Sequence, residues 1–166
     1  GNLLVSADYS QFELRLAAVL AGDQQMIADF ESGIDIHAKT AADVRGIALE
    51  DVTKDMRRDA KVVNFGVLYG MGPHALAGNT GMTFGEAKDF IEQYFELRKP
   101  IREFIDATLK KAETEGYVET LYGRRRPTPD IKSSNFMVRE AAKRAAFNMP
   151  IQGTEADIMK LAMIAV

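Results

Sequence analysis

The stretch RRDAKVVNFGVLYG, residues 57–70, begins with cations and ends with aromatic residues and glycines. Four of its side chains recur at every fourth position: Arg57, Lys61, Phe65 and Tyr69. On an α-helix this spacing turns by about 40° per step, so the four form a gently spiralling row, the cation–aromatic stripe. Apolar residues cluster on another side of the helix: Met56, Ala60, Val63 and Val67. The helix therefore has a separate face for packing and does not need the stripe for its core.

The stripe has two interpretations. Its aromatic residues could fill a second packed interface, with the two cations merely solvated. Alternatively, Arg57 and Lys61 could contact adjacent phosphates, the first through a planar fork and the second as a point charge. Phe65 would then be placed to stack on a base, and the glycines after Tyr69 would let a second base approach closely. In that case the stripe meets the phosphates of a nucleotide first and its base last.

Helical patterns continue on both sides of this stretch. Thr53 can cap its helix, which Gly70, Gly72 and Pro73 can end. One further helix is expected within residues 10–23, with Phe12, Leu16, Val19 and Leu20 as its apolar face and Gly22 at its end. The other expected helices lie over 24–32, from Asp35 to about Arg45, over 84–98 after Thr83, and from Pro100 to Gly116. A hairpin is expected around Gly123. Pro150 and Gly153 are expected to separate two last helices, about 133–148 and 154–166, the second capped by Thr154.

The apolar run NLLVSAD, residues 2–8, predicts a buried strand that ends at Asp8. The predicted fold class is therefore mainly α with a few short β-strands (α+β). Asp8, at a strand end before a turn, could hold a hard divalent cation together with the backbone carbonyl of Tyr9. The simpler alternative is that Asp8 is a turn or capping residue. Glu13, in the first turn of the next helix, could simply complement the helix dipole.

Composition narrows the class of protein. The 166 residues are 46% hydrophobic and 27% charged, contain no cysteine and have a net charge of −3. No run of about 18 apolar residues is present, so we expect no membrane span. The mild negative charge conceals a basic segment, since residues 124–144 carry seven Lys or Arg against Asp130 and Glu140. This segment could attract phosphates, or be an ordinary solvated face.

Two segments together resemble a known family. DYSQFELR at 8–15, followed by RRDAKVVNFGVLYG, is similar to the family A DNA polymerases of the bacterial DNA polymerase I type. The similarity extends over the chain through DIHAKTAADV, GYVETLYGRRR, PDIKSSN and NMPIQGTEADI. It implies a palm piece at 1–14 with the metal-binding strand and turn, fingers at 15–132, and palm-side helices at 133–166. We expect the chain to be part of a longer protein and to end before the third catalytic motif of the family.

The resemblance also implies roles for individual residues. Asp8 and Lys61 would be catalytic, and Asp8 with the Tyr9 carbonyl would bind Mg²⁺, of which the complete enzyme uses two. Glu13 would be the steric gate that leaves no room for a 2′-hydroxyl. The implied nucleotide-binding residues are Ser10, Gln11, Glu13, His37, Arg57, Lys61, Phe65 and Tyr69. The implied DNA-binding residues are Tyr69, Arg144, Asn148 and Gln152. His37 could equally be a surface histidine.

By this resemblance the chain is part of a template-directed DNA polymerase of the bacterial cytoplasm, with primer–template DNA and deoxynucleoside triphosphates as partners and no membrane. We expect the fragment alone to be inactive, because one carboxylate cannot hold two Mg²⁺. Two alternatives remain: a non-catalytic nucleotide- or DNA-binding module, and a relative of the single-subunit RNA polymerases. Glu13 and Phe65 favour DNA over RNA synthesis. An exposed strand edge near Asp8 could also drive self-association.

Overall fold

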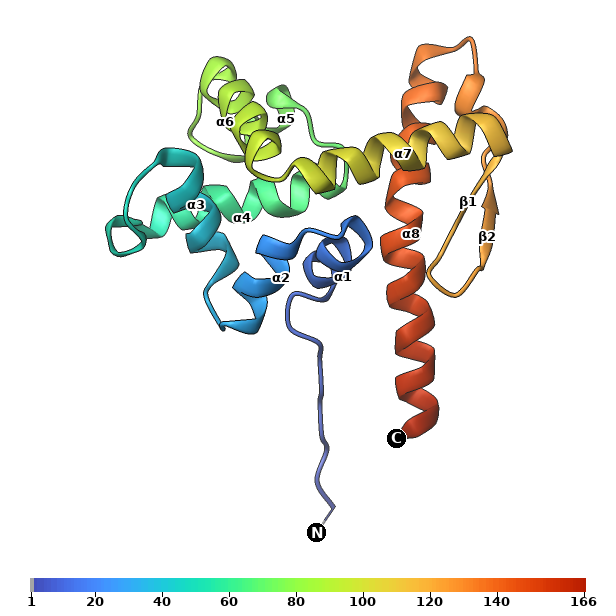
Figure 1. Cartoon of the computed structure of the whole chain (residues 1–166), viewed down its shortest axis with the longest axis horizontal. Helices are drawn as coiled ribbons and strands as arrows, with labels where there is room; N and C mark the ends of the chain where they lie inside the picture. The colour runs from blue at the N-terminus through green and yellow to red at the C-terminus, as the bar shows by residue number, and fades with distance from the viewer. Residues whose placement is uncertain (1) are drawn as a thin grey trace.

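The computed structural model describes residues 2–166, and it is mainly helical with one two-stranded sheet (Figure 1). The helices are α1 (Phe12–Ala21), α2 (Gln24–Glu31), α3 (Ile36–Arg45), α4 (Lys54–Leu68), α5 (Pro73–Asn79), α6 (Phe84–Leu97), α7 (Lys99–Glu115) and α8 (Phe136–Ala165). The strands are β1 (Tyr117–Glu119) and β2 (Arg125–Pro127), and two 3-10 turns are η1 (Leu49–Asp51) and η2 (Pro129–Lys132). The predicted α+β class is confirmed.

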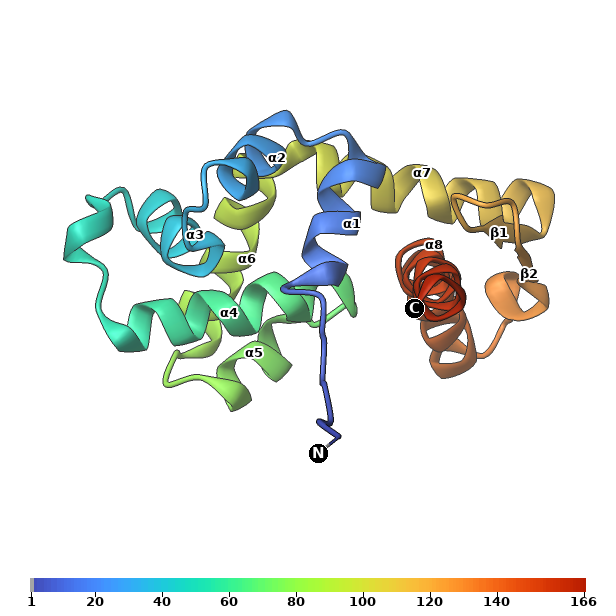
Figure 2. The ribbon, with the colours of Figure 1, turned by 90° about the horizontal axis from the view of Figure 1, so that it is seen from below.

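The helices are arranged around α1, which contacts α2, α4, α7 and α8. Figures 1 and 2 show α7 running from the group formed by α3 to α6 across to the β1–β2 hairpin and α8. One apolar core lies around α1 and α2, and a second lies between α3, α4, α5 and α6. A third, smaller core joins α7, the hairpin, η2 and α8. Among residues 2–166, no helix is both long and apolar enough to cross a bilayer.

Local capping explains where most helices begin and end. The Asp35 carboxylate accepts hydrogen bonds from the backbone N–H groups of His37 (3.0 Å) and Ala38 (3.1 Å) at the start of α3. Thr83 and Glu86 form a reciprocal capping box at the start of α6. Gly116 ends α7 with a φ of 77°, a left-handed conformation that glycine adopts without strain. The predicted starts and stops at these positions are confirmed.

The predicted packing face of α4 is confirmed: Ala60, Val63 and Val67 are buried in the second core. The apolar face predicted for α1 was partly wrong, because Val19 is 58% exposed while Leu14 and Ala17 are buried. The short helix α5 was not predicted; Pro73, taken only as the end of the preceding helix, also begins this one.

A buried ion-pair cluster ties α2 to the junction of α6 and α7. Arg98, at that junction, is 4% exposed. Its Nη1 lies 3.5 Å from Oδ1 of Asp23, and its Nη2 lies 3.1 Å from Oδ2 of Asp29. Asp23 also caps α2 by accepting from the backbone N–H of Met26. Removing one member would leave buried charge without a partner, so these residues act together.

The predicted strand ending at Asp8 was wrong. Residues 2–9 have no regular secondary structure, and Leu3, Leu4 and Val5 are exposed. Figure 1 shows this segment running away from α1 as an extended trace. A strand needs a neighbour for its backbone hydrogen bonds, and within residues 2–166 the sheet consists of β1 and β2 alone, with Tyr117 opposite Pro127. Gly1, the first residue of the predicted palm piece, lies outside the described residues.

The predicted break at Pro150 and Gly153 was also wrong, because α8 continues from Phe136 to Ala165. Pro150 is buried within it, and the helix packs against α1, α7, β1 and η2. A Cβ on Gly153 would lie 2.6 Å from Cγ2 of Thr120, so this glycine permits close packing of the hairpin rather than ending a helix. Thr154 is no cap; its hydroxyl accepts from the backbone N–H of Leu121 at 2.9 Å.

Candidate nucleotide-binding site

The cation–aromatic stripe lies on the surface of α4. Arg57 and Lys61 are exposed, Phe65 is half-buried against the first core, and Tyr69 is 39% exposed. Packing therefore occupies only part of the stripe, at Phe65. The two cations and the Tyr69 side chain stay accessible for a ligand.

Asp35 fixes the first cation of the stripe. Its Oδ2 accepts a hydrogen bond from Nε of Arg57 at 2.7 Å, while its Oδ1 caps α3. Burial acts to raise the pKa of Asp35, but hydrogen bonds from the Ala38 backbone and from Arg57 outweigh it, and the pKa lies below its usual value. Asp35 therefore links the start of α3 to the stripe and holds the Arg57 guanidinium in one orientation.

His37 lies behind the stripe. It is 2% exposed; Asn64 donates from Nδ2 to its Nδ1 at 3.0 Å, and the ring centroids of His37 and Phe65 are 5.8 Å apart. Burial lowers the pKa of His37, and the charges of Arg57 and Lys61 lower it further against the opposing charge of Asp35. A neutral imidazole here supports Phe65 from behind. A contact between His37 and a triphosphate stays a prediction.

The turn before α1 approaches the same place. Gln11 has a φ of 53°, a conformation that non-glycine residues adopt rarely. Its Nε2 lies 3.5 Å from Nε2 of His37. The backbone carbonyl of Ser10 accepts from Nε of Arg15 at 3.0 Å, which holds the turn closed. The predicted nucleotide-binding residues Ser10 and Gln11 thus start α1 beside α3.

Tyr69 joins the stripe to α1 and α8. Its hydroxyl donates a hydrogen bond to Oε2 of Glu13. Burial and the contact with Glu13 raise the pKa of Tyr69 to about 12. Tyr69, Glu13 and Gln152 line one small hollow with Asn148, whose Oδ1 is buried and has no hydrogen-bond partner within residues 2–166. The residues predicted to contact the sugar (Glu13), the template (Tyr69) and the DNA (Asn148 and Gln152) therefore line the same hollow.

Gly70 brings the end of α4 against α8. Its φ is 70°, and a Cβ there would lie 2.8 Å from Cγ of Arg144 and 2.9 Å from Cζ of Phe147. Only a residue without a side chain permits this approach without a shift. Arg144 therefore lies beside the end of the stripe, one helical turn before Asn148.

Asp8 is less well supported than the stripe. It lies on the exposed segment 2–9, where the ring of the next residue, Tyr9, packs 4.6 Å from that of Phe12. In the described part of the chain, no three residues of the His, Cys, Asp and Glu types come together to hold a metal ion. Mg²⁺ is, however, often held by one or two carboxylates plus waters and substrate phosphates. Asp8 and the Tyr9 carbonyl fit such an open, partial ligand set.

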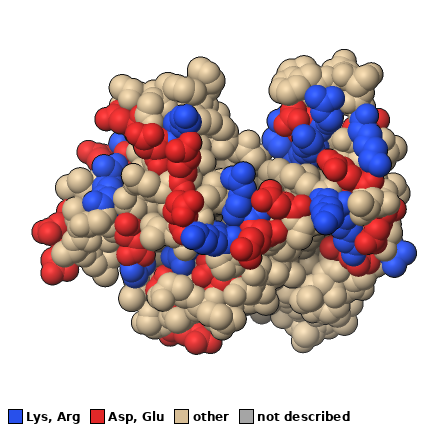
Figure 3. Space-filling view, turned by 45° about the horizontal axis from the view of Figure 1, so that its top comes forward, with Lys and Arg blue, Asp and Glu red and all other residues tan. Residues whose placement is uncertain are grey.

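The basic segment is partly neutralised within the fold. Figure 3 shows Lys and Arg side chains gathered on the side of the hairpin and η2, interspersed with acidic ones. Nε of Arg124 lies 2.9 Å from Asp157, and Nε of Arg125 lies 3.3 Å from Glu119. The first pair attaches the hairpin to α8, and the second joins its two strands, so the local excess of positive charge is smaller than the sequence indicates.

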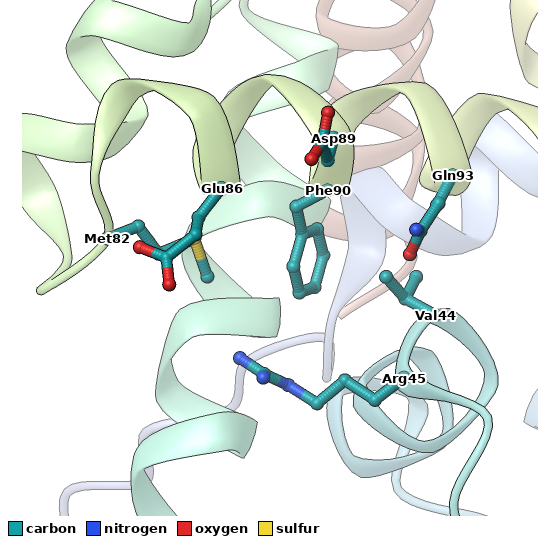
Figure 4. A pocket seen from close by; sticks show the side chains of 7 residues that line it. All are labelled: Val44, Arg45, Met82, Glu86, Asp89, Phe90 and Gln93. Carbon is teal, nitrogen blue, oxygen red and sulfur yellow. The ribbon is translucent and has the colours of Figure 1, made fainter.

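A separate hollow lies between α3 and α6 and contains none of the predicted site residues (Figure 4). In Figure 4, Arg45 reaches from α3 toward Glu86 and Phe90 of α6. Its guanidinium carbon is 5.8 Å from the centroid of the Phe90 ring. This contact fastens α3 to α6, and the hollow adds nothing to the stripe.

Residues 1–166 match the family model described as DNA polymerase family A. The chain belongs to DNA polymerase family A. It is 52% identical over 164 residues to the thermostable DNA polymerase I of Thermus thermophilus, an alignment that covers 99% of this chain and 20% of that protein. It is 54% identical over 164 residues to the DNA polymerase I of Deinococcus radiodurans, covering 99% of this chain and 17% of the relative. The family predicted from the two motifs is confirmed.

A solved structure has the same fold: the POL domain of Pol1 from M. smegmatis, in complex with DNA primer-template and dNTP. The TM-score is 0.88 at 41% sequence identity, and the match covers 95% of this chain and 28% of that one. The family A chain described here thus spans about a fifth of the length of the curated relatives it matches. The roles of individual residues are not tested by these likenesses and stay predictions.

Two polar residues of this family A site were missed in the sequence. Asn64 lies on α4 between two stripe positions and is 1% exposed, hydrogen-bonded to His37 and Thr40. Its signal was a polar residue beside the apolar face of the helix. Glu155 lies three residues after Gln152 on α8. It was missed because a helix break was expected before it.

Proposed function

We propose that this chain supplies the nucleotide-gripping surface and one metal-binding carboxylate of a DNA polymerase that copies a template by adding deoxynucleotides to a primer 3′ end. The observation that carries the proposal is the stripe itself. Its two cations are exposed and one is held in place by Asp35, while Tyr69 meets Glu13 at its other end. Support comes from the similar solved structure, which was determined with DNA primer-template and dNTP.

Arg57 and Lys61 would bind the triphosphate of the incoming nucleotide. The guanidinium of Arg57 is anchored through Nε by Asp35, which leaves its two terminal nitrogens for phosphate oxygens. Lys61, one turn further along α4, would place a second positive charge against the phosphates and against the charge that develops on the leaving pyrophosphate. Lys61 is therefore assigned to catalysis as well as to binding.

Phe65 and Glu13 would select the nucleotide. Phe65, supported from behind by His37, would lie against the incoming nucleotide, next to Ser10 and Gln11 in the turn before α1. Glu13 would lie beneath the sugar and exclude a 2′-hydroxyl, which selects deoxyribose by steric conflict.

Tyr69 and three residues of α8 would contact DNA. The Tyr69 ring would stack at the template position. Arg144, Asn148 and Gln152 would face the minor groove, where purine N3 and pyrimidine O2 accept hydrogen bonds in every correct pair. This proposal gains support from Gly70, which brings Arg144 against the end of the stripe, and from the hollow that Tyr69, Asn148 and Gln152 share.

Asp8 and the carbonyl of Tyr9 would hold Mg²⁺, which supplies a Lewis acid for the primer hydroxyl and the phosphates. A groove beside Asp8 is lined by Met159 and Met163 from the end of α8. Because this groove is lined by both ends of the chain, it supports grouping residues 1–14 and 133–166 as palm pieces, with fingers at 15–132 between them. The domain bounds, like the bacterial cytoplasmic location and self-association, remain predictions.

The 166-residue chain alone should not polymerise. Asp8 provides a single carboxylate, on a segment whose residues 2–9 are exposed and have no regular secondary structure. A primer-extension assay with primed template, Mg²⁺ and all four deoxynucleotides should give no product above background. Clear extension would overturn this part of the proposal.

A chimera tests the proposed activity directly. This chain replaces the matching segment of the Thermus thermophilus DNA polymerase I, to which it is 52% identical. The chimera should extend a primer, and Asp8→Ala should reduce extension by about a thousandfold or more while leaving DNA binding intact. A folded chimera that extends equally well with Asp8→Ala would favour the non-catalytic binding module. Equal use of ribonucleotides would favour the RNA polymerase alternative.

A further inference from the structure

A buried polar cluster lies directly behind the stripe, formed by His37 and Thr40 of α3 and Asn64 of α4. The hydroxyl of Thr40 donates to the backbone carbonyl of Ile36 at 2.8 Å, so its oxygen accepts from Nδ2 of Asn64 at 3.2 Å. The same Nδ2 donates to Nδ1 of His37 at 3.0 Å. Burying polar side chains costs stability unless they are hydrogen-bonded, and packing alone does not account for three of them at this place.

These bonds locate the proton of the His37 ring. A neutral imidazole carries one N–H, and its other nitrogen accepts. Burial is the main cause that lowers the pKa of His37 below 6.5, so the ring is neutral at neutral pH. Because Nδ1 accepts from Asn64, the proton lies on Nε2.

The Nε2 edge of the ring faces the turn before α1. Nε2 of the half-buried Gln11 lies 3.5 Å from Nε2 of His37. Both nitrogens carry hydrogen, so they do not bond one another, and their separation is also at the outer limit for a hydrogen bond. Two donors thus lie side by side, an arrangement that suits one shared acceptor oxygen.

The His37 ring also lies beside the cations of the stripe. The carboxylate of Asp35 accepts from the backbone N–H of His37 through Oδ1 and from Nε of Arg57 through Oδ2. Arg57 and Lys61 are near enough for their charges to lower the pKa of His37. The acceptor that suits this place is therefore an anionic oxygen, such as that of a phosphate.

We propose that Asn64 is a positioning residue for nucleotide binding: it holds the His37 ring with Nε2–H toward Gln11, where that N–H and the Gln11 amide donate to one oxygen of the triphosphate. The inference rests on the proposed function of the stripe. Asn64 is buried beneath His37 and does not touch the nucleotide, so it acts only through the ring. Without Asn64 the ring is free to rotate about its Cβ–Cγ bond and turn Nε2 away.

The position of the ring proton can be measured directly. In the 166-residue chain with ¹⁵N-labelled histidine, at about pH 7.5, the His37 ring should be protonated at Nε2 and unprotonated at Nδ1. His37→Gln assigns the signals. A proton on Nδ1 would overturn the inference.

A substitution at position 64 should move that proton. Asn64→Asp replaces the donor by a carboxylate that only accepts, so Nδ1 of His37 should become protonated. Asn79→Asp adds the same charge at an exposed position of α5 and should leave the ring unchanged. If Nδ1 stays unprotonated in Asn64→Asp, residue 64 does not set the state of the ring and the inference is wrong.

A double-mutant cycle tests whether Asn64 acts through His37. Asn64→Leu should weaken binding of a deoxynucleoside triphosphate by about tenfold, because a donor to a charged oxygen is misplaced. In a His37→Leu background the same substitution should change the affinity by less than about twofold. Equal weakening in both backgrounds would show a merely structural effect and overturn the inference. Circular dichroism checks folding; if Asn64→Leu does not fold, the ring signals of Asn64→Asp decide.

Titration with a deoxynucleoside triphosphate separates the two levels of failure. Amide shifts at Arg57 and Lys61 report on the stripe, and a shift of the His37 Nε2 signal reports on the donor. If the amides shift and Nε2 does not, the inference is wrong and the proposed function stands. If neither shifts, the stripe does not bind the triphosphate and the inference falls with the proposed function.

Discussion

The two halves of the candidate site differ in how the chain supports them. The triphosphate half lies on α4, where Arg57 is bonded to the cap of α3 and Phe65 rests on a buried His37 that Asn64 holds. The metal half is Asp8, on an exposed segment without secondary structure. The proposed phosphate-binding residues are therefore held in place by contacts within the helices of this chain. The proposed metal-binding residues would need a partner for residues 2–9.

The largest expected effect concerns the helical body that carries the supported half. Arg98→Ala should lower the free energy of unfolding by about 3–5 kcal/mol, because it leaves Asp23 and Asp29 buried without a partner. Urea unfolding followed by circular dichroism measures this. Arg102→Ala is the control, since Arg102 is exposed and its pair with Asp106 should contribute less than about 1 kcal/mol. Equal losses in both variants would show that the buried cluster does not stabilise the body.

The next effect is on the stripe itself. Arg57→Ala should weaken binding of a deoxynucleoside triphosphate by about tenfold or more, since a charge-assisted hydrogen bond to phosphate is lost. Isothermal titration with Mg²⁺ present measures the affinity. Arg58→Ala is a matched control, because Arg58 is the neighbouring exposed arginine and forms its ion pair with Asp55, off the stripe. If Arg58→Ala weakens binding as much as Arg57→Ala, only net charge matters and the stripe is not a site.

Acid should lower the stability of the folded chain through His37, which lies behind the stripe. The pKa of His37 is lowered in the folded chain by burial and by Arg57 and Lys61, from an ordinary value of 6.5. The unfolded chain therefore binds more protons below about pH 6.5, and stability falls as the pH falls. The free energy of unfolding should therefore fall as the pH drops below about 6.5, until His37 is protonated in the folded chain as well. His37→Gln should lose this contribution between pH 7.5 and 5.5, whereas the exposed His74→Gln should keep it. If stability falls equally with pH in the unsubstituted chain, His37→Gln and His74→Gln, then His37 does not cause the fall.

The smallest effect belongs to the unsupported half. Asp8→Ala should change the free energy of unfolding of the 166-residue chain by less than about 0.5 kcal/mol, because the residue is exposed and outside the cores. Thermal unfolding under identical conditions measures it. A loss above about 1 kcal/mol would mean that Asp8 is held by contacts that its exposure does not indicate, and the contrast between the halves would disappear.

Sequence alone predicts the supported half better than the unsupported one, for a physical reason. The cap at Asp35, the capping box at Thr83 and the apolar face of α4 depend on residues close together in the chain, and all are found. The strand at 2–8 failed because a strand depends on a neighbour that local pattern does not reveal.

The remaining errors have the same origin. Pro150 indicates a helix end by local rules, but packing of α8 on four other elements overrides the lost backbone hydrogen bond. The pair of Arg98 with Asp29 joins residues 69 positions apart, which no spacing pattern marks. Glu155 was overlooked because it shares a helix with Gln152 only if α8 continues through Pro150.

The most direct test of a preformed triphosphate half is a titration of the 166-residue chain with a deoxynucleoside triphosphate, with and without Mg²⁺, followed by amide-resolved NMR. We expect shifts clustered at Arg57, Lys61 and Phe65, with the nucleotide alone sufficient to produce them. Mg²⁺ alone should leave Asp8 and Tyr9 almost unmoved, because their ligand set is incomplete. A well-dispersed spectrum without shifts on α4, or a response confined to Asp8, would contradict the account.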